Sequence, residues 1–304
     1  MTTVIDLFAG LGGFSEGAKL ARMRPVWAGN HWPMACYYHG VNQGLVPACQ
    51  DVQQQDWRDV PAHDGLLASP ACQGHSPARG KEKAHHDALR STAWAVVACM
   101  EYHREAFAVV ENVPEFLKWN LYPSWCDALQ RLGYTVSPHI VDAADHGVPQ
   151  NRERVFIVIT RSAAPLVLDL PKVPHVAVDA FIEWDAHAWS PIDKPGRASA
   201  TLARVAAGRA RFGRRFVAPF YGSGSGATGR SVHRPIGTLT TIDRWAVVDG
   251  ERMRVLQPSE NLAIMTFRRD TILPPAKRDA MKLIGNAVAP IVARDILRAV
   301  QRQL

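Results

Sequence analysis

Short apolar runs alternate with segments of helical spacing from the N-terminus to Thr160. The apolar runs predict strands at Thr3–Phe8, Pro25–Ala28, Gly65–Ala68, Ala106–Val110 and Val155–Thr160. Between them, apolar residues recur with the spacing of one helix face, which predicts helices at Phe14–Arg22, Pro33–Gly40, Ser91–His103 and Tyr122–Leu132. This alternation predicts an α/β fold that is built on a parallel, doubly wound sheet.

The alternation stops after Thr160. Residues 162–232 are rich in Pro, Gly, Ala and Arg and show little periodicity, whereas Lys277–Leu304 returns to helical spacing. We therefore predict a large domain from residues 1–161, completed by residues 275–304. Residues 162–274 are predicted to form a smaller, inserted domain.

Charge adds a candidate class of partner. The chain has 304 residues, a formal net charge of +7 and a pI near 9.3, which suits a polyanionic partner. Residues 162–232 carry nine basic and five acidic residues, and Arg204–Arg215 contains five arginines and no acid. From charge alone, this arginine cluster fits a solvated helix face as well as a nucleic-acid surface.

Cysteine spacing and hydropathy exclude several classes. The five cysteines are odd in number and include no Cys-x-x-Cys pair, which argues against a disulfide framework and a zinc knuckle. We expect no metal site, and we expect Cys99 and Cys126 to be buried in helices. Met1–Val4 enters a strand-like run at once, so we expect no signal peptide, and no apolar run approaches the roughly 20 residues of a membrane span.

The first predicted strand leads into a glycine-rich turn, Phe8-Ala9-Gly10-Leu11-Gly12-Gly13, which precedes a helix. Glycines let the backbone approach a ligand, and the free N–H groups of a helix N-terminus bind anionic groups. Such a turn predicts a nucleotide-type cofactor. By itself it is equally compatible with NAD, with FAD or with mere packing.

Two reactive side chains follow two other predicted strands. Cys72 follows Gly65–Ala68, and Glu111 follows Ala106–Val110, so both lie at carboxyl ends of strands, where parallel sheets place their sites. A cysteine is a strong nucleophile and a good leaving group. A carboxylate at the end of a buried strand must be paired or functional.

Six motifs stand in one order along the chain: the glycine turn, Ser69–Ser76 around Cys72, Glu111-Asn112-Val113, Gln150–Arg154, Arg234-Pro235 with Thr238-Leu239-Thr240, and Gly285–Val288. In this order they resemble the DNA (cytosine-5) methyltransferases, from Thr3 to the C-terminal helix. The resemblance implies an enzyme with S-adenosyl-L-methionine as cofactor and double-stranded DNA as partner. Its reaction would methylate C5 of a flipped-out cytosine in a specific sequence, as in restriction-modification systems.

The resemblance also assigns the domains and the surroundings of the protein. The large domain would be the catalytic and cofactor-binding domain, and the inserted one the target-recognition domain. We expect a cytoplasmic monomer that associates with the nucleoid when it is bound to DNA.

The resemblance implies a role for each matching residue. Cys72 would attack C6, Glu111 would hydrogen-bond N3, and Arg152 and Arg154 would hold the base and an adjoining phosphate. The residues expected to bind the cofactor are Phe8, Gly10, Gly12, Gly13, Asn30, His31, Trp32, Asp51, Val52, Pro70, Asn286 and Ala287. Those expected to contact DNA are Gln73, Ser76, Arg79, Arg211, Arg214 and Arg215.

Three positions depart from the family pattern. The family usually has Glu at the position of His31, Pro at the position of Ala71 and an aromatic residue at the position of His75. Without that Glu, the ribose hydroxyls would be held by Asn30 or His31.

Three other functions fit parts of the sequence. An RNA cytosine-5 methyltransferase would share the core, but the basic insert favours DNA. A catalytically inactive, sequence-specific DNA-binding protein would not need both Cys72 and Glu111. A Rossmann-type oxidoreductase would leave Cys72, Glu111 and the two arginines unexplained.

Overall fold

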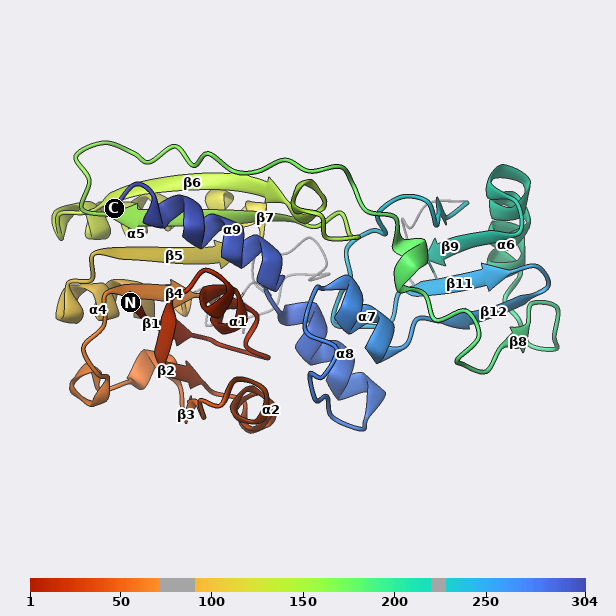
Figure 1. Ribbon diagram of the computed structural model, residues 1–304, viewed down its shortest axis with the longest axis horizontal. Coiled ribbons are helices and arrows are strands. Elements are labelled where there is room, and N and C mark those ends of the chain that lie inside the picture. The colour runs from red at the N-terminus through yellow and green to blue at the C-terminus, as the bar shows by residue number, and fades with distance from the viewer. Residues whose placement is uncertain (72–90, 220–227) are drawn as a thin grey trace. The chain divides into compact units, whose positions relative to one another are not determined.

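The computed structural model describes residues 1–71, 91–219 and 228–304 (Figure 1). These residues form two compact units. The first consists of Met1–Asp142, Glu153–Lys172 and Ala287–Leu304, and the second of Ala143–Arg152 and Val173–Asn286. The sequence-based division assigned residues 143–152 and 275–286 to the large domain and residues 162–172 to the inserted one. The functional division of the chain stays a prediction.

The first unit is built on a seven-stranded sheet. Its strands are β1 (Thr3–Leu7), β2 (Arg24–Asn30), β3 (Ala48–Cys49), β4 (Gly65–Ala68), β5 (Phe107–Asn112), β6 (Thr135–Asp142) and β7 (Glu153–Thr160). The order across the sheet is β3-β2-β1-β4-β5-β7-β6. The α/β class is confirmed. The sheet is mixed rather than parallel, because β7 runs antiparallel to both β5 and β6.

Strand β6 was not predicted, and its sequence explains why. Pro138 interrupts an otherwise strand-like segment, and a proline has no N–H to donate to a neighbouring strand. A proline is tolerated in an edge strand, and β6 pairs only with β7. The connection from β6 to β7 contains no α-helix, so no crossover is available and the two strands pair antiparallel.

Helices of the first unit cover the sheet and bury its apolar side chains. They are α1 (Gly13–Leu20), α2 (Pro33–Gln43), α4 (Trp94–His103), α5 (Tyr122–Arg131) and α9 (Pro290–Gln301). Short 3₁₀ turns lie at Val52–Gln54, Trp57–Asp59 and Pro114–Lys118. The largest fully buried side chains of this unit are aromatic: Phe14, Phe107, Phe116, Trp125 and Phe156.

Helices α1 and α9 lie side by side (Figure 1), although one begins the chain and the other ends it. A Cβ atom added to Gly17 would lie 2.4 Å from Cβ of Ala293 and 2.8 Å from the carbonyl oxygen of Pro290, so glycine allows this approach. The sequence predicted a return to helical structure over Lys277–Leu304. The chain forms α8 (Lys277–Asn286) there and then α9, whose first residue is Pro290.

The second unit contains a five-stranded sheet in which every pair is antiparallel. Its strands are β8 (Ser190–Pro191), β9 (Arg215–Pro219), β10 (Arg230–Ser231), β11 (Trp245–Asp249) and β12 (Arg252–Val255), in the order β10-β9-β11-β12-β8. Its helices are α6 (Ser199–Phe212), α7 (Pro258–Ile264) and α8. Helix α6 packs on β9, where a Cβ atom on Gly208 would lie 2.3 Å from the ring of Phe216.

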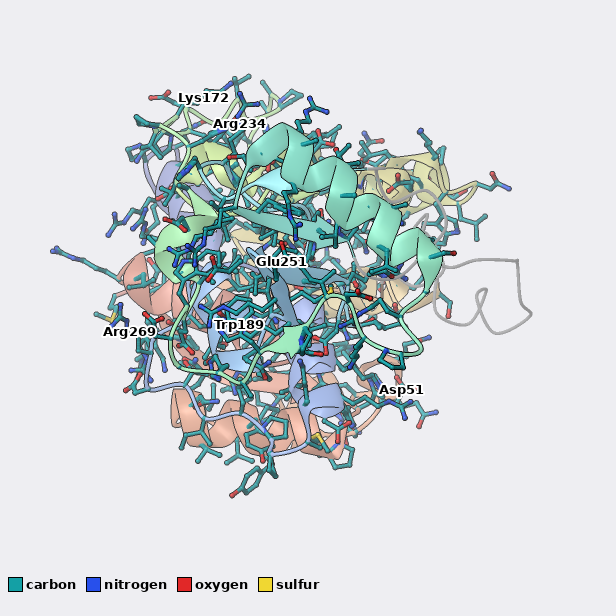
Figure 2. The ribbon with its side chains drawn as sticks, turned by 90° about the vertical axis from the view of Figure 1, so that its right-hand side faces the viewer. Asp51, Lys172, Trp189, Arg234, Glu251 and Arg269 are labelled. Carbon is teal, nitrogen blue, oxygen red and sulfur yellow. The ribbon has the colours of Figure 1, made fainter. Side chains whose placement is uncertain are left out.

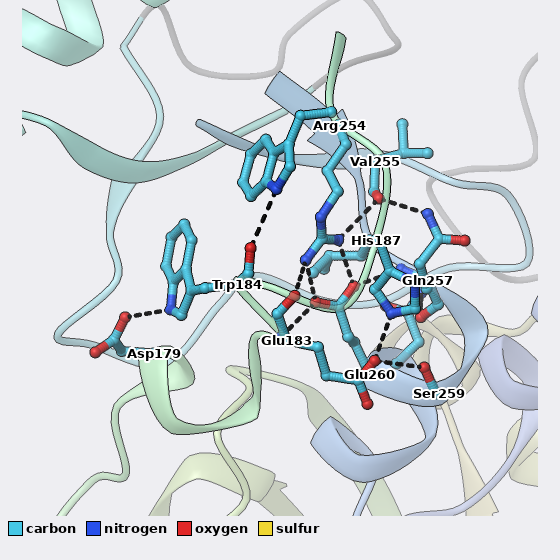
Figure 3. A network of polar contacts seen from close by, with 12 residues as sticks. Asp179, Glu183, Trp184, His187, Arg254, Val255, Gln257, Ser259 and Glu260 are labelled. Carbon is cyan, nitrogen blue, oxygen red and sulfur yellow. Dashed lines mark hydrogen bonds and ion pairs between the residues drawn. The ribbon is translucent and has the colours of Figure 1, made fainter. Parts of the chain in front are cut away.

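A polar network fixes one end of this unit (Figure 3). The guanidinium of Arg254 donates to both carboxylate oxygens of Glu260 at 2.7 Å, and this pair is buried. Glu260 also accepts from the backbone N–H groups of Gln257 and Glu183. A bidentate ion pair of this kind, with two further backbone donors on the carboxylate, holds the start of α7 against the segment before β8.

None of the described helices combines the length and the apolar character that a membrane crossing requires.

We predict that Gly17→Ala lowers the stability of the chain by about 1–3 kcal/mol, because the new methyl group overpacks the α1–α9 contact. Urea denaturation followed by circular dichroism measures this loss. Adding Ala293→Gly should restore part of it, since Pro290 still crowds the site. Leu20→Ala, on the exposed end of the same helix, is the control. Equal stabilities of Gly17→Ala and this control would show that the two helices do not pack as closely as described.

Candidate active site

The glycine turn is a backbone-strained corner between β1 and α1. Phe8, Gly10 and Gly12 all have positive φ angles, at 62°, 54° and 93°. For Phe8 this left-handed conformation costs about 1–2 kcal/mol, and such strain is concentrated at functional sites. A Cβ atom on Gly12 would lie 2.7 Å from the side chain of Gln43, so only glycine fits there. The turn leaves the N-terminus of α1 at the carboxyl edge of the sheet.

Three buried polar side chains, one each from β1, α1 and α2, form a hydrogen-bonded group next to this corner. The hydroxyl of Ser15 donates to Oδ2 of Asp6 at 2.7 Å, and its oxygen lies 3.2 Å from Nε2 of His39. Nδ1 of His39 lies 2.8 Å from the carbonyl oxygen of Leu45, so this nitrogen carries a proton. All three side chains are inaccessible to solvent.

Burial favours the uncharged forms of Asp6 and His39. It raises the pKa of Asp6 to about 7 and lowers the pKa of His39 to about 4. Ser15 has one hydroxyl proton, which both an ionised Asp6 and a neutral His39 would accept. Protonation of Asp6 supplies the missing proton, so the neutral acid allows Ser15 to hydrogen-bond with both Asp6 and His39, while Oδ1 of Asp6 stays without a partner among the described residues.

The predicted ribose and adenine residues lie at the carboxyl ends of β2 and β3. Oδ1 of Asn30 accepts from the backbone N–H of Trp32 at 2.9 Å, so this side chain shapes the turn after β2. His31 is exposed and Trp32 is half-buried. Asp51 is exposed and accepts from the backbone N–H of Gln53, while Val52 is buried beneath it.

The last two predicted cofactor residues fall on either side of the unit boundary. Asn286 ends α8 in the second unit and is exposed, and Ala287 belongs to the first unit and is buried. Within the second unit, Gly285 lies against Thr240, because an added Cβ atom would be 2.4 Å from the carbonyl carbon of that residue. The structure therefore brings two of the six motifs together.

Glu111 and Arg154 form an ion pair at the carboxyl edge of the sheet. Nε of Arg154 lies 3.1 Å from Oε1 of Glu111, and both side chains are largely buried. Glu111 is near the end of β5 and Arg154 is near the start of β7. The antiparallel pairing of these strands puts the two positions at the same edge.

The chain is anchored next to this pair, just before Cys72. Nδ2 of Asn112 donates to the carbonyl oxygen of Pro70 at 3.1 Å, and the backbone N–H of Ala71 donates to the hydroxyl of Thr92 at 3.2 Å. The segment that leads into Cys72 therefore starts beside Glu111. Cys72 itself lies outside the described residues, as do Gln73, Ser76 and Arg79.

Arg152 has surroundings that differ from those of Arg154. It is 4% exposed and belongs to the second unit, where it donates to the carbonyl oxygens of Leu239 and Gly285 at 3.0 Å each. Gln150 accepts from the backbone N–H of Leu239 at 2.7 Å. The side chains of Gln150 and Arg152 thus connect their own motif to the backbones of two others, at Leu239 and Gly285. The family resemblance paired Arg152 with Arg154 at the base and an adjoining phosphate. In the structure Arg154 lies in β7, which begins at Glu153, whereas Arg152 precedes that strand.

Two arginines of the predicted DNA cluster share one carboxylate. Arg214 and Arg215 lie 2.7 and 3.3 Å from Asp249, and Arg252 lies 2.7 Å from it. Burial raises the pKa of Asp249, but hydrogen bonds from Arg214 and Arg252 outweigh it and hold the pKa at about 2. Arg215 also stacks on the ring of Trp184 at 4.4 Å.

Arg211 instead lines a basic cavity of about 820 Å³ in the second unit. Further basic side chains on its wall were not among the residues expected to contact DNA: His175, Arg230, His233 and Arg234, the last of which is labelled in Figure 2. Arg230 donates to Oδ1 of Asn151 at 3.2 Å. The signal that could have found Arg230, His233 and Arg234 is the Arg-Ser-Val-His-Arg run that they form.

Known proteins resemble this chain along its whole length. A family profile described as C-5 cytosine-specific DNA methylase matches residues 2–187 and 208–302. The type II methyltransferase M.MspI of Moraxella sp is 26% identical over 297 residues, which span 95% of this chain and 68% of that protein. M.AplI of Arthrospira platensis is 29% identical over 317 residues, or 99% and 86%. M.NlaX of Neisseria lactamica is 32% identical over 163 residues, about half of each chain (52%).

Solved structures share the fold. A mutant of DNMT2 from Spodoptera frugiperda superposes with a TM-score of 0.73 at 16% identity, over 99% of this chain and all of that one. The methyltransferase EhMeth of Entamoeba histolytica gives a TM-score of 0.70 at 14% identity, over 100% and 98%. The mixed seven-stranded sheet is therefore a Rossmann-like methyltransferase fold.

We predict that Asp6→Asn gains stability over the wild type as pH rises from about 4 to 7. In this range the folded wild type holds a proton that the unfolded chain has released, so its stability falls with pH by up to roughly 1 kcal/mol per pH unit. The asparagine has no such proton to lose. Urea denaturation between pH 5 and 8 measures the difference, which should level off above pH 7.

The control is Asp64→Asn. Hydrogen bonds from Thr3 lower the pKa of Asp64, so its effect on stability should be constant between pH 5 and 8. A pH-independent difference between Asp6→Asn and the wild type would contradict a neutral Asp6.

Proposed function

Because the chain belongs to the C-5 cytosine-specific DNA methylase family, we propose that it methylates C5 of a flipped-out cytosine in a specific double-stranded DNA sequence, with S-adenosyl-L-methionine as donor. The observation that carries this proposal is the Glu111–Arg154 pair, which lies beside the anchored segment leading into Cys72. The acid therefore lies at the carboxyl edge of the sheet, beside the start of the segment that carries the proposed nucleophile.

The chemistry explains why both groups are needed. Cytosine C5 is a weak nucleophile in the aromatic ring. Addition of the Cys72 thiolate to C6, with Glu111 hydrogen-bonded at N3, gives C5 the electron density of an enamine. After methylation, loss of the C5 proton and release of the thiol restore the ring. Arg154 fixes the orientation of the Glu111 carboxyl group before the base enters, so N3 of the base meets a preorganised partner that can share a proton with it.

The residues at the ends of β1, β2 and β3 fit the proposed cofactor, which would supply a methyl group on a positively charged sulfur. The corner from Phe8 to Gly13 lets the backbone approach a ligand, and N–H groups at the start of α1 suit its carboxylate. We assign the adenine to Trp32 and Asp51. His31, exposed at the end of β2, takes the ribose hydroxyls, since Asn30 already accepts from the backbone.

The second unit carries the proposed DNA surface. Arg211, Arg230 and Arg234 line one basic cavity, and guanidinium groups bind phosphates and guanine edges by paired hydrogen bonds. Arg214 and Arg215 are partly exposed but share Asp249, so each offers less net charge to a phosphate. We therefore place the main contact at the cavity. Base-resolution cytosine sequencing of DNA from expressing cells would test activity and target together.

We predict that DNA with 5-fluorocytosine at the target forms a covalent adduct with the wild-type chain when the donor is present. The proton at C5 can leave as a cation but fluorine cannot, so the Cys72–C6 bond persists and survives denaturing electrophoresis. Cys72→Ala should give no adduct. Glu111→Gln should form it about 10²–10⁴ times more slowly, because N3 loses its proton partner.

Cys126→Ser is the matched control, because Cys126 lies half-buried on α5 and should leave adduct formation unchanged. Adduct formation by Cys72→Ala would disprove the covalent mechanism. So would its absence from a wild type that methylates ordinary DNA.

We predict that Arg211→Ala and Arg234→Ala each weaken DNA binding about tenfold at low salt and reduce the slope of log affinity against log salt by about 1. Arg214→Ala should have a smaller effect, because Asp249 already balances its charge. Fluorescence anisotropy across a salt series measures both quantities. Arg131→Ala, on α5 of the first unit, is the control. Full affinity in both cavity variants would remove the cavity from the DNA surface.

A further inference from the structure

Three metal-ligating side chains converge in the first unit, away from the carboxyl edge. Nε2 of His63 and Sγ of Cys99 each lie 3.1 Å from Oε1 of Glu105, and the three atoms all lie within 4.8 Å of one another. The side chains of His63 and Glu105 are inaccessible to solvent, and Cys99 is fully buried. His63 stands just before β4 and Glu105 just before β5, so the cluster lies at the amino ends of the strands.

The local backbone is shaped to bring these groups together. Cys99 and His103 lie four residues apart on α4, and therefore on one face of that helix. The helix ends at Arg104, which adopts a left-handed conformation with φ of 57°. This reversal returns Glu105 to the interior, where the hydroxyl of Tyr134 donates to its carbonyl oxygen at 3.0 Å.

The tautomer of His63 makes the contact with Glu105 dependent on a cation. Nδ1 of His63 lies 2.7 Å from the carbonyl oxygen of Pro61, so Nδ1 carries a proton. In a neutral imidazole, Nε2 then presents a lone pair to a carboxylate oxygen, which is repulsive. The contact is favourable only when a proton, carried by either group, or a metal ion lies between the two atoms.

The charge balance allows both. With one proton shared by His63 and Glu105 and a neutral Cys99 thiol, the net charge of the cluster is zero. If one divalent cation replaces the shared proton and the thiol proton, the cluster holds a neutral imidazole, a carboxylate, a thiolate and M²⁺. Its net charge is again zero, so the exchange adds no uncompensated charge to the interior.

We propose that His63, Cys99 and Glu105 bind one zinc ion. Nitrogen, sulfur and oxygen donors in this combination suit zinc, and a tetrahedral site separates adjacent nitrogen or sulfur and oxygen ligands by roughly 3.3–3.6 Å. The two 3.1 Å contacts at Glu105 are close to that spacing. The hydrogen bond from Nδ1 of His63 to a backbone carbonyl is the support that zinc-bound histidines ordinarily have.

Two buried atoms point to the same conclusion. Among the described residues, Oε2 of Glu105 and Nε2 of His103 are buried and have no hydrogen-bond partner. The rings of His63 and His103 are 4.6 Å apart. A buried polar atom without a partner is costly, and a cation at this cluster gives the second oxygen of Glu105 a favourable charge nearby. Each ligand comes from a different segment, so no cysteine motif marks the site.

The position of the site assigns it a structural role. It fastens the loop before β4 to the end of α4 and the start of β5, at the edge of the sheet opposite Glu111. Zinc bound there stabilises the folded chain without touching the reacting groups. Stability, rather than methyl transfer, is therefore the property that zinc should change.

Metal-stripped full-length protein tests this proposal. We expect it to bind one zinc ion per chain by calorimetry, with release of two protons. Its melting temperature should rise by roughly 5 °C at a hundredfold excess over the dissociation constant. Cobalt in place of zinc should give the absorption band of a thiolate–cobalt bond.

Variants identify the ligands. Cys99→Ser should abolish the thiolate–cobalt band, and His63→Gln and Glu105→Gln should each weaken zinc binding at least tenfold. Cys126→Ser changes a half-buried cysteine of the same unit that lies outside the cluster, and this variant should keep the band and the affinity. Because a variant can fail to fold, the zinc-dependent melting of the wild type is an independent measurement. No stoichiometric binding by the wild type, or a band that persists in Cys99→Ser, would overturn the proposal.

Discussion

The direction of one strand determines where the candidate chemistry can occur. Strand β7 runs antiparallel to β5, so the start of β7 lies at the carboxyl end of β5. For this reason Arg154 reaches Glu111, although 43 positions separate them in the sequence. A parallel β7 would have placed its first residues at the amino ends of the other strands. The acid would then need another partner to balance and orient its charge.

The sequence predicted the elements of the first unit better than their directions. Apolar runs identified β1, β2, β4, β5 and β7, because each strand is largely apolar, is at least partly buried and has the required length. Periodicity carries no information about direction, so the antiparallel step at β7 was missed. Pro138 concealed β6, since its acceptability depends on an edge position that only the assembled sheet provides.

The candidate site was predicted unevenly for a similar reason. Motifs identify which side chains can react, and the structure places Glu111 and the segment before Cys72 together. The motifs do not show which polar side chains are already hydrogen-bonded to the backbone. Arg152 and Asn30 both match residues expected to meet a ligand, yet both are hydrogen-bonded to the backbone. The basic cluster gives a similar example, because two of its arginines form ion pairs with Asp249, which lies 34 positions after Arg215.

A carboxyl group in the interior must either be paired with a positive charge or stay protonated, and three buried carboxyl groups of the described residues meet this requirement to different degrees. Arg254 and Glu260 neutralise each other through two hydrogen bonds. Asp6 avoids a buried charge by keeping its proton, so it requires no partner of opposite charge. Glu105 has neither solution in full, because burial favours a protonated acid while His63 and Cys99 lower its pKa and keep it charged. An ionised carboxylate held in the interior by two weakly acidic donors is a site that a divalent cation can occupy with no change in net charge. The cluster lies at the amino ends of the strands, whereas the strained glycine turn and Glu111 lie at the carboxyl edge. A metal ion at the cluster would therefore stabilise one edge of the sheet without restricting the backbone at the other edge, where the candidate chemistry occurs.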